Sequence, residues 1–238
     1  MKQAQIKLYK FSELDDSVKQ KMVEEKKFDI GYELMDCYGD DYQETLKRFC
    51  ELMGITMKDW RVDYCGYYFT FRFNDEILMG DWRGKEFSAE EITGKLLRRW
   101  LNNNFMYNAL PRKKYYKYDA GWNKELKRWN KQRYSRIFHE RWDECPLTGT
   151  CYDYEIMKPI IDCLSKPISE SYSLYDLVED VLDNFFNSWH EEYEYWCDNT
   201  DGCIEDELEQ RYDGEVFDED GTTVVGKYEE ILEEAICE

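Results

Sequence analysis

The clearest periodic pattern in the chain is an apolar stripe at helical spacing between residues 173 and 197. Ser173 precedes the stripe and Asp176 stands three residues later, which predicts a capping box at the start of a helix. Acidic residues fill the positions between the apolar ones. The stripe consists of Leu174, Leu177, Val178, Val181, Leu182, Phe185, Trp189, Tyr193 and Trp196. We therefore expect a long amphipathic helix here.

Weaker patterns predict further helices. Residues 14–27 carry apolar positions at helical spacing behind Ser12 and Asp15, either of which could cap a helix. Helical spacing continues over 30–53, and we expect a break or a kink near Gly39 and an end at Gly54. A Ser88–Glu91 capping-box pattern predicts another helix. Shorter helices are expected between the turns at 146–149 and 166–169, at 201–212 and near the C-terminus.

Strand patterns are few. The stretch "YYFTFRF" alternates aromatic with small or charged residues, which predicts a half-buried strand within 60–80. We expect shorter strands at 5–11 and at 215–225, the latter around an Asp-Gly turn. The segment from about Trp122 to 142 is predicted to be helical. The fold class is therefore α+β, mostly helical with a small antiparallel sheet.

Charge divides the chain more sharply than hydrophobicity does. Residues 170–238 hold 24 acidic and two basic residues, whereas residues 83–141 hold 16 basic and six acidic residues. We distinguish an N-terminal α+β region (1–110), a basic aromatic middle with a turn motif (111–169) and an acidic helical C-terminal region (170–238), which together could form one compact domain. This asymmetry favours electrostatically steered association, or pairing between the two segments.

The sequence contains neither an apolar stretch long enough to span a membrane nor a secretory signal. We therefore expect a cytoplasmic protein with reduced thiols. Two cysteine pairs have the same spacing, Cys145 with Cys151 and Cys197 with Cys203. Four thiolates could bind zinc, but a five-residue insert exceeds the usual spacing of zinc ligands. We interpret these thiols as packing residues and expect no metal or other cofactor.

Catalytic motifs are not evident. The chain has no phosphate-binding glycine loop, and its two histidines, His139 and His190, lie in different segments without a recognisable nucleophile motif. We expect a protein that is not an enzyme. An enzyme or zinc protein built around the cysteine pairs is kept as a third alternative.

Two charged surfaces are candidates for binding. Cations interleaved with tyrosines in the middle segment suit phosphate contact and base stacking, which would make the chain a direct nucleic-acid-binding module. Its candidate residues are Arg98, Arg99, Arg112, Lys113, Lys114, Lys117, Lys124 and Arg128. Carboxylates fixed on helices of the acidic segment could instead imitate a phosphate backbone and attract a basic protein. These candidates are Glu191, Glu192, Glu194, Asp201, Glu205, Asp206 and Glu209.

Three stretches together resemble a family of acidic proteins encoded by phages and prophages. "YKFSELDDSVKQK" matches the family's opening at Tyr9, Phe11, Glu13, Leu14, Lys19 and Lys21, whereas Asp15 and Val18 replace its usual Ser and Ala. "CPLTGTCYDYEIMKPI" is similar to its middle motif, matching at Pro146, Thr148, Gly149, Asp153, Pro159 and Ile160. "IEDELEQRYDGEVFDEDG" is similar to its end, matching at Glu205, Asp206, Asp218, Asp220 and Gly221.

The resemblance implies a phage or prophage protein that acts in a bacterial cytoplasm. The family is mostly uncharacterised. Some members carry antitoxin labels, and similar mobile-element proteins include inhibitors of CRISPR effector nucleases. The resemblance supplies no catalytic residues. Together with the charge pattern, it leads us to expect an anti-CRISPR inhibitor whose acidic surface mimics nucleic acid and blocks an RNA-guided nuclease or its guide-RNA complex, with direct nucleic-acid binding through 83–141 as the alternative.

Overall fold

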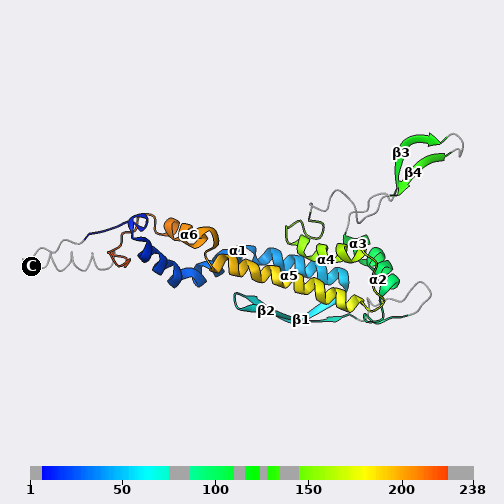
Figure 1. Cartoon of the computed structure of the whole chain (residues 1–238), viewed down its shortest axis with the longest axis horizontal. Coiled ribbons are helices and arrows are strands. Elements are labelled where there is room, and N and C mark those ends of the chain that lie inside the picture. Colours follow the sequence, from blue (N-terminus) through cyan, green and yellow to red (C-terminus); the bar gives the residue numbers. More distant parts are fainter. Residues whose placement is uncertain (1–6, 75–85, 110–115, 124–127, 134–144, 225–238) are drawn as a thin grey trace, which may run out of the picture. The chain divides into compact units, whose positions relative to one another are not determined.

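The computed structural model describes residues 7–74, 86–109, 116–123, 128–133 and 145–224 (Figure 1). The fold is α+β and mostly helical, as the sequence predicts, and its described strands form two antiparallel pairs. The chain forms two compact units, which we call unit 1 (1–38 with 191–238) and unit 2 (39–190). No helix among the described residues is both long enough and apolar enough to cross a membrane.

The first long helix, α1, spans Asp16–Met53 and follows a 3-10 turn, η1 (Phe11–Glu13). The carbonyl of Asp15 accepts the N–H groups of Val18 and Lys19, so the helix begins where the sequence predicts. It ends at Gly54, whose φ of 68° suits glycine. The break expected near Gly39 is wrong: the helix is continuous, since burial of its apolar face on both sides outweighs the roughly 1 kcal/mol that an internal glycine costs.

The second long helix, α5 (Leu174–Cys197), confirms the predicted stripe. The backbone N–H and the hydroxyl of Ser173 both donate to Asp176 Oδ2 at 2.8 Å, and the Asp176 N–H donates back to Ser173 Oγ at 3.2 Å. Helices α1 and α5 lie side by side (Figure 1). Within unit 2 the rings of Tyr42 and Trp189 stack with centroids 4.8 Å apart. Hydrophobic burial along this seam holds the two helices together.

The predicted capping-box hydrogen bond at Ser88 forms, but it closes a turn and does not start a helix. The Ser88 N–H donates to Glu91 Oε2 at 2.8 Å, yet helix α2 begins only at Gly94 (Gly94–Trp100). The intervening backbone is extended because it pairs with the start of α5: the Leu174 N–H donates to Ile92 O, and Thr93 bridges Ser173. A π-helical turn, η2 (Leu101–Phe105), and the short α3 (Met106–Ala109) follow.

Strand β2 (Gly66–Phe73) confirms the strand that the alternating aromatic pattern predicts, and it forms a hairpin with β1 (Ile55–Asp63), most of which the pattern does not predict. The register pairs Trp60 with Phe69, and a bulge interrupts the ladder after Met57. Rings of Trp60, Tyr67 and Phe69 surround Phe186 of α5, with centroid separations of 5.3 to 6.2 Å. Only one face of the hairpin is therefore buried, which explains its period of two.

Three local predictions are wrong or reduced. Of the strand expected at 5–11, the described part makes a single bridge, Tyr9 to Phe217, and then enters η1. The pair expected at 215–225 is reduced to one bridge between Phe217 and Thr223. Of the helix expected from about Trp122 to 142, the described residues 122–123 and 128–133 lie instead in two antiparallel strands, β3 (Tyr116–Asn123) and β4 (Arg128–Arg133). The rest of that stretch lies outside the described residues. Tyr and Trp favour strands, and that preference prevails over the charged helical pattern.

The turn motif at 145–152 leads into helix α4 (Asp153–Ser165), as predicted. Asp153, the first helical residue, is fully buried. Its Oδ2 accepts the backbone N–H groups of Leu147 (2.7 Å), Thr148 (2.8 Å) and Gly149 (3.3 Å), and its Oδ1 accepts the hydroxyls of Thr148 (2.7 Å) and Thr45 (3.2 Å). Since Thr45 belongs to α1, this carboxylate fastens the turn to the long helix.

Pro159 lies inside α4 without breaking it. Proline has no N–H, so the carbonyl of Glu155, four residues earlier, loses its helical donor. Asn184 of α5 supplies a replacement, because its Nδ2 donates to Glu155 O at 2.9 Å and to Glu155 Oε2 at 3.0 Å. The hydrogen bond that the internal proline removes is thus replaced by one from the neighbouring helix α5.

Candidate partner-binding surface

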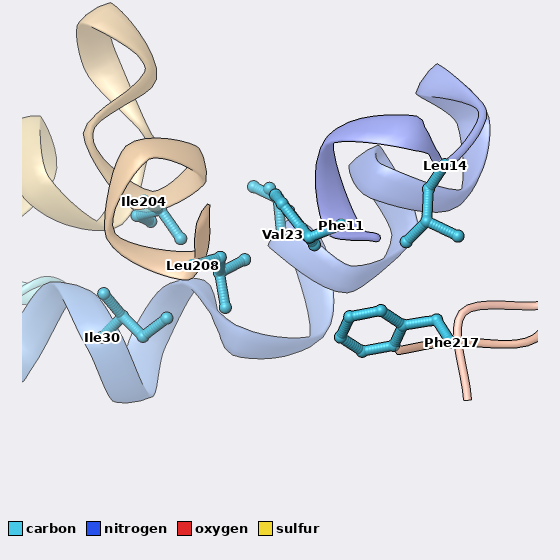
Figure 2. Close-up of a cluster of buried hydrophobic side chains, with 7 residues drawn as sticks. All are labelled: Phe11, Leu14, Val23, Ile30, Ile204, Leu208 and Phe217. Atoms are coloured by element: carbon cyan, nitrogen blue, oxygen red, sulfur yellow. The ribbon is translucent and has the colours of Figure 1, made fainter. Parts of the chain in front are cut away.

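Unit 1 is built around a small apolar core (Figure 2). It joins η1, the first part of α1, helix α6 (Cys203–Arg211) and the segment after it. The buried side chains are Phe11, Leu14, Val23, Ile30, Ile204, Leu208 and Phe217. Tyr212 completes the aromatic end of this core, with its ring centroid 5.9 Å from Phe11 and 5.1 Å from Phe217. Hydrophobic burial therefore holds residues 11–30 against residues 204–217.

A tight turn fixes where α6 starts. Asn199, Asp201 and Gly202 all have positive φ values, of 53°, 56° and 76°. Asn199 Oδ1 accepts the backbone N–H groups of Ile204 (2.7 Å) and Glu205 (3.3 Å), which satisfies donors at the N-terminus of the helix. Acidic residues in this first turn, Glu205 and Asp206, also interact favourably with the helix dipole.

Two contacts tie α5 and α6 to α1. Arg211 of α6 donates to Glu33 of α1 at 2.6 Å and to Glu207 at 2.8 Å. Gly31 allows α1 to approach the end of α5 closely, since a Cβ at this position would lie 2.7 Å from the sulfur and 2.8 Å from the Cα of Cys197. The carboxylates on α1, α5 and α6 within unit 1 are thus held in a fixed arrangement.

Folding concentrates the negative charge of the chain in unit 1. Unit 1 contains 27 acidic and nine basic residues, a formal charge of −18, whereas unit 2 contains 25 acidic and 23 basic residues, a charge of −2. Nearly all of the net charge of −20 therefore belongs to 86 of the 238 residues. At this density the surface attracts basic partners over a distance of about 8 Å at physiological salt.

All seven carboxylates that the sequence singles out lie in unit 1. Exposed ones stand on α5 (Glu191, Glu194), on the turn (Asp201) and on α6 (Asp206, Glu209). Glu192 and Glu205 are half-buried, and burial raises the pKa of Glu192 above its ordinary value. We call the exposed carboxylates of unit 1 the acidic surface.

The acidic residues of α1 also belong to this surface, although they are not among the seven predicted carboxylates. They are exposed along the part of the helix that belongs to unit 1: Glu24, Glu25, Asp29, Glu33 and Asp36. Their charge is partly balanced by lysines on the same helix, because Lys21, Lys26 and Lys27 lie within 4.0 Å of acidic neighbours. Local composition therefore gives little sign of them, and only the polar face of the amphipathic pattern indicates that they are exposed.

The basic candidates are distributed differently. Arg98 serves the fold, because its guanidinium donates to the carbonyl of Leu164 at 2.6 Å and to the carbonyl of Lys166. Arg99 is exposed on α2. Lys117 and Arg128 belong to the β3–β4 hairpin, whose register pairs Tyr116 with Arg133 and Tyr118 with Lys131. Arg112, Lys113, Lys114 and Lys124 lie outside the described residues, as does His139.

The cysteine pairs are not brought together. Cys145 and Cys151 belong to unit 2, whereas Cys197 and Cys203 belong to unit 1. Each of these four thiols is free, and nowhere in the described ranges do three potential metal ligands gather. Burial raises the pKa of Cys197 to about 11, which disfavours the thiolate needed for metal binding. His190 contacts the backbone instead, with Nδ1 2.8 Å from Asp63 O.

Comparison with known proteins gives no relative for this chain: no family model, no curated protein and no solved structure matches it. The function is therefore inferred from the arrangement of charge and aromatic side chains described above.

Proposed function

We propose that this chain is a phage-encoded binding protein whose acidic surface occupies the nucleic-acid-binding surface of a basic partner. The partner that we propose is an RNA-guided nuclease or its guide-RNA complex, so that the chain acts as an anti-CRISPR inhibitor in the cytoplasm of a bacterial host. The observation that carries the proposal is the charge of −18 concentrated in unit 1, about half of whose acidic residues stand on the packed helices α1, α5 and α6. The family resemblance points to the same class of protein.

The spacing of the carboxylates supports mimicry. An α-helix rises about 1.5 Å per residue, so residues three apart follow one another at about 4.5 Å along the axis. This separation, which applies to Glu191 and Glu194 and to Asp206 and Glu209, is comparable to the roughly 3.4 Å per phosphate of one DNA strand. A flexible acidic tail would lose conformational entropy when it bound, whereas these side chains are already positioned.

A competition experiment tests the proposal. A purified guide-loaded nuclease would be titrated with labelled target DNA in the presence of the full chain. We expect the chain to displace DNA, and the inhibition to weaken as salt increases. The double variant Asp206→Lys/Glu209→Lys removes two exposed carboxylates of α6, so it should lose at least tenfold in inhibition, because each reversal replaces attraction by repulsion.

The matched control reverses two exposed carboxylates of unit 2, Asp162 and Glu179, to lysine. It changes the net charge by the same amount and should inhibit almost as well as the wild type. If both double variants lose inhibition equally, only the net charge of the chain matters. That result would contradict the proposal that a particular surface of unit 1 binds the partner. Absence of any DNA displacement across a panel of guide-loaded nucleases would reject the nuclease as partner.

Direct nucleic-acid binding is the second candidate. The register of β3 and β4 pairs aromatic residues with cations, Tyr116 with Arg133 and Tyr118 with Lys131. Proteins that bind single strands combine cations for the phosphates with rings on which bases stack. Titration of a labelled single-stranded oligonucleotide, with Lys117→Glu/Arg128→Glu as the variant, separates the two candidates. Salt-sensitive binding that this variant abolishes would favour the hairpin over the acidic surface.

A further inference from the structure

Three aromatic rings form a continuous row on unit 1, which we call the ring row: Tyr38, Trp196 and Tyr195. Tyr38 of α1 stacks on Trp196 of α5 with centroids 5.9 Å apart and planes 13° apart. Tyr195 meets Trp196 edge-on at 5.1 Å and 89°. Tyr38 is 38% exposed and Tyr195 is 36% exposed, although the other end of α5 buries its large apolar side chains completely. The ring row is thus an exposed aromatic patch on a rigid helix pair.

Carboxylates adjoin the ring row. The hydroxyl of Tyr195 donates to Asp201 Oδ2 at 3.3 Å. Glu192 lies one helical turn before Trp196 on the same helix, so the two side chains are neighbours on one face. Burial raises the pKa of Glu192, and the Trp196 side chain beside it partly offsets this effect by stabilising the carboxylate. Aromatic faces with carboxylates beside them are the two features that a guanidinium group requires.

We propose that the ring row is the site where the acidic surface receives an arginine side chain of its basic partner. This inference rests on the proposed function, since it identifies the anchor of the same interface. The guanidinium plane would lie against the exposed ring of Tyr38 or Tyr195, while its N–H groups donate to the carboxylates of Asp201 and Glu192. Aromatic anchors surrounded by polar groups are where binding energy concentrates in protein interfaces.

Charge complementarity selects this occupant over others. A second copy of the chain would bring another charge of −18 against this surface, and nucleic acid would bring phosphates, so both would be repelled. Lysine would satisfy the carboxylates, but its compact, strongly hydrated ammonium lacks the planar face that stacks on a ring. The ring row therefore predicts a preference for arginine over lysine, which the acidic surface alone does not.

Two labelled peptides of equal length and charge, one with arginine and one with lysine, test this inference by fluorescence anisotropy on the full chain. We expect the wild type to prefer the arginine peptide. Tyr38→Ala/Tyr195→Ala should weaken arginine-peptide binding about two- to fivefold and remove the preference, since this is what one exposed cation–ring contact contributes. Tyr38→Phe/Tyr195→Phe keeps both rings and should retain the preference.

Two controls keep the result specific to the ring row. Phe28→Ala removes another exposed ring of unit 1, one that is 45% exposed, and should leave the preference unchanged. Tyr38→Leu/Tyr195→Leu keeps apolar bulk without an aromatic face and should lose the preference while it melts near the wild-type temperature. A wild type that binds both peptides equally, or a Leu variant that still prefers arginine, would overturn the inference.

The two proposals can fail separately. If the chain displaces DNA from a nuclease through Asp206 and Glu209 but shows no dependence on Tyr38 and Tyr195, the proposed function stands and the ring row is not its anchor. If the arginine preference depends on the rings but no nuclease is inhibited, the ring row is an arginine site of a different interface. Self-association of the wild type that Tyr38→Ala abolishes, measured by sedimentation, would assign the ring row to a second copy and refute the inference.

Discussion

Replacing Asp153 by alanine is the most informative perturbation of the fold. The carboxylate is fully buried, accepts five hydrogen bonds and connects the 145–152 turn to Thr45 of α1. Alanine would leave two backbone donors that now bond at 2.7 and 2.8 Å, those of Leu147 and Thr148, without their acceptor. It would also remove a negative charge from the first residue of α4, where the helix dipole favours one.

The expected loss follows from these bonds. Hydrogen bonds to charged groups contribute about 1.5–3 kcal/mol each, and the low end applies here because the turn is only half-buried and water could replace part of each bond. Counted at this low end, the three short bonds give about 3–5 kcal/mol for Asp153→Ala, and the two longer ones add little. This is a large share of a typical total of roughly 5–15 kcal/mol. Asp153→Asn should cost only about 1–2 kcal/mol, because its oxygen can accept from the backbone while the threonine hydroxyls rotate to accept from its amide.

Urea unfolding followed by far-UV circular dichroism measures the loss, and hydrogen exchange of residues 145–152 locates it. The matched control is Asp162→Ala, an exposed carboxylate on the same helix, which should remain within about 0.5 kcal/mol of the wild type. If Asp153→Ala costs less than about 1 kcal/mol and the turn amides exchange no faster, the bonds described here do not stabilise the turn and the reasoning is refuted.

Two further predictions concern Arg98 and the buried thiols. Arg98→Ala should lower the free energy of unfolding by about 1–3 kcal/mol, because it removes the donors that bond the carbonyls at the end of α4. The control, Lys95→Ala at an exposed position of the same helix as Arg98, should leave the free energy of unfolding unchanged. Chemical denaturation measures both. Burial raises the pKa of Cys50 to about 12 and that of Cys163 to about 11, from an ordinary value of 9.0. Between about pH 9 and pH 11–12 the folded thiols keep their protons, whereas the thiols of the unfolded chain have lost theirs. The free energy of unfolding should therefore fall as pH rises through this range. Unfolding measurements at stepped alkaline pH that show no decline would contradict this. In the folded protein at neutral pH, iodoacetamide should modify exposed Cys151 long before Cys50.

Several elements could be read directly from local sequence. The capping residues Asp15 and Ser173, the stop at Gly54 and the apolar stripe of α5 all act within one or two helical turns, so their effect does not depend on distant parts of the chain. Strand β2 was predictable for the same reason, whereas its partner β1 was not. The sequence also determined that acidic charge dominates the C-terminal third, which is where all seven candidate carboxylates lie.

Local signals failed where another segment supplied the deciding contact. The Ser88–Glu91 box does not start a helix, because the backbone that follows pairs with Ser173 and Leu174 across more than 80 residues. Pro159 does not break α4, because Asn184 satisfies the carbonyl that proline leaves free. Such contacts depend on which segments meet, and no short window of sequence contains that information.

The candidate site likewise combines features that can be read from the sequence with features that only the fold sets. Composition determined the sign and amount of charge, but only the tertiary structure decided that the first part of α1 belongs with residues 191–238 and adds its carboxylates to theirs. The ring row also exists only in the fold, since Tyr38 and Trp196 are separated by more than 150 residues and stack because Gly31 lets α1 approach α5 closely. Charge is a property of single residues and can be counted along the chain, whereas a binding surface is a property of distances, which only folding sets.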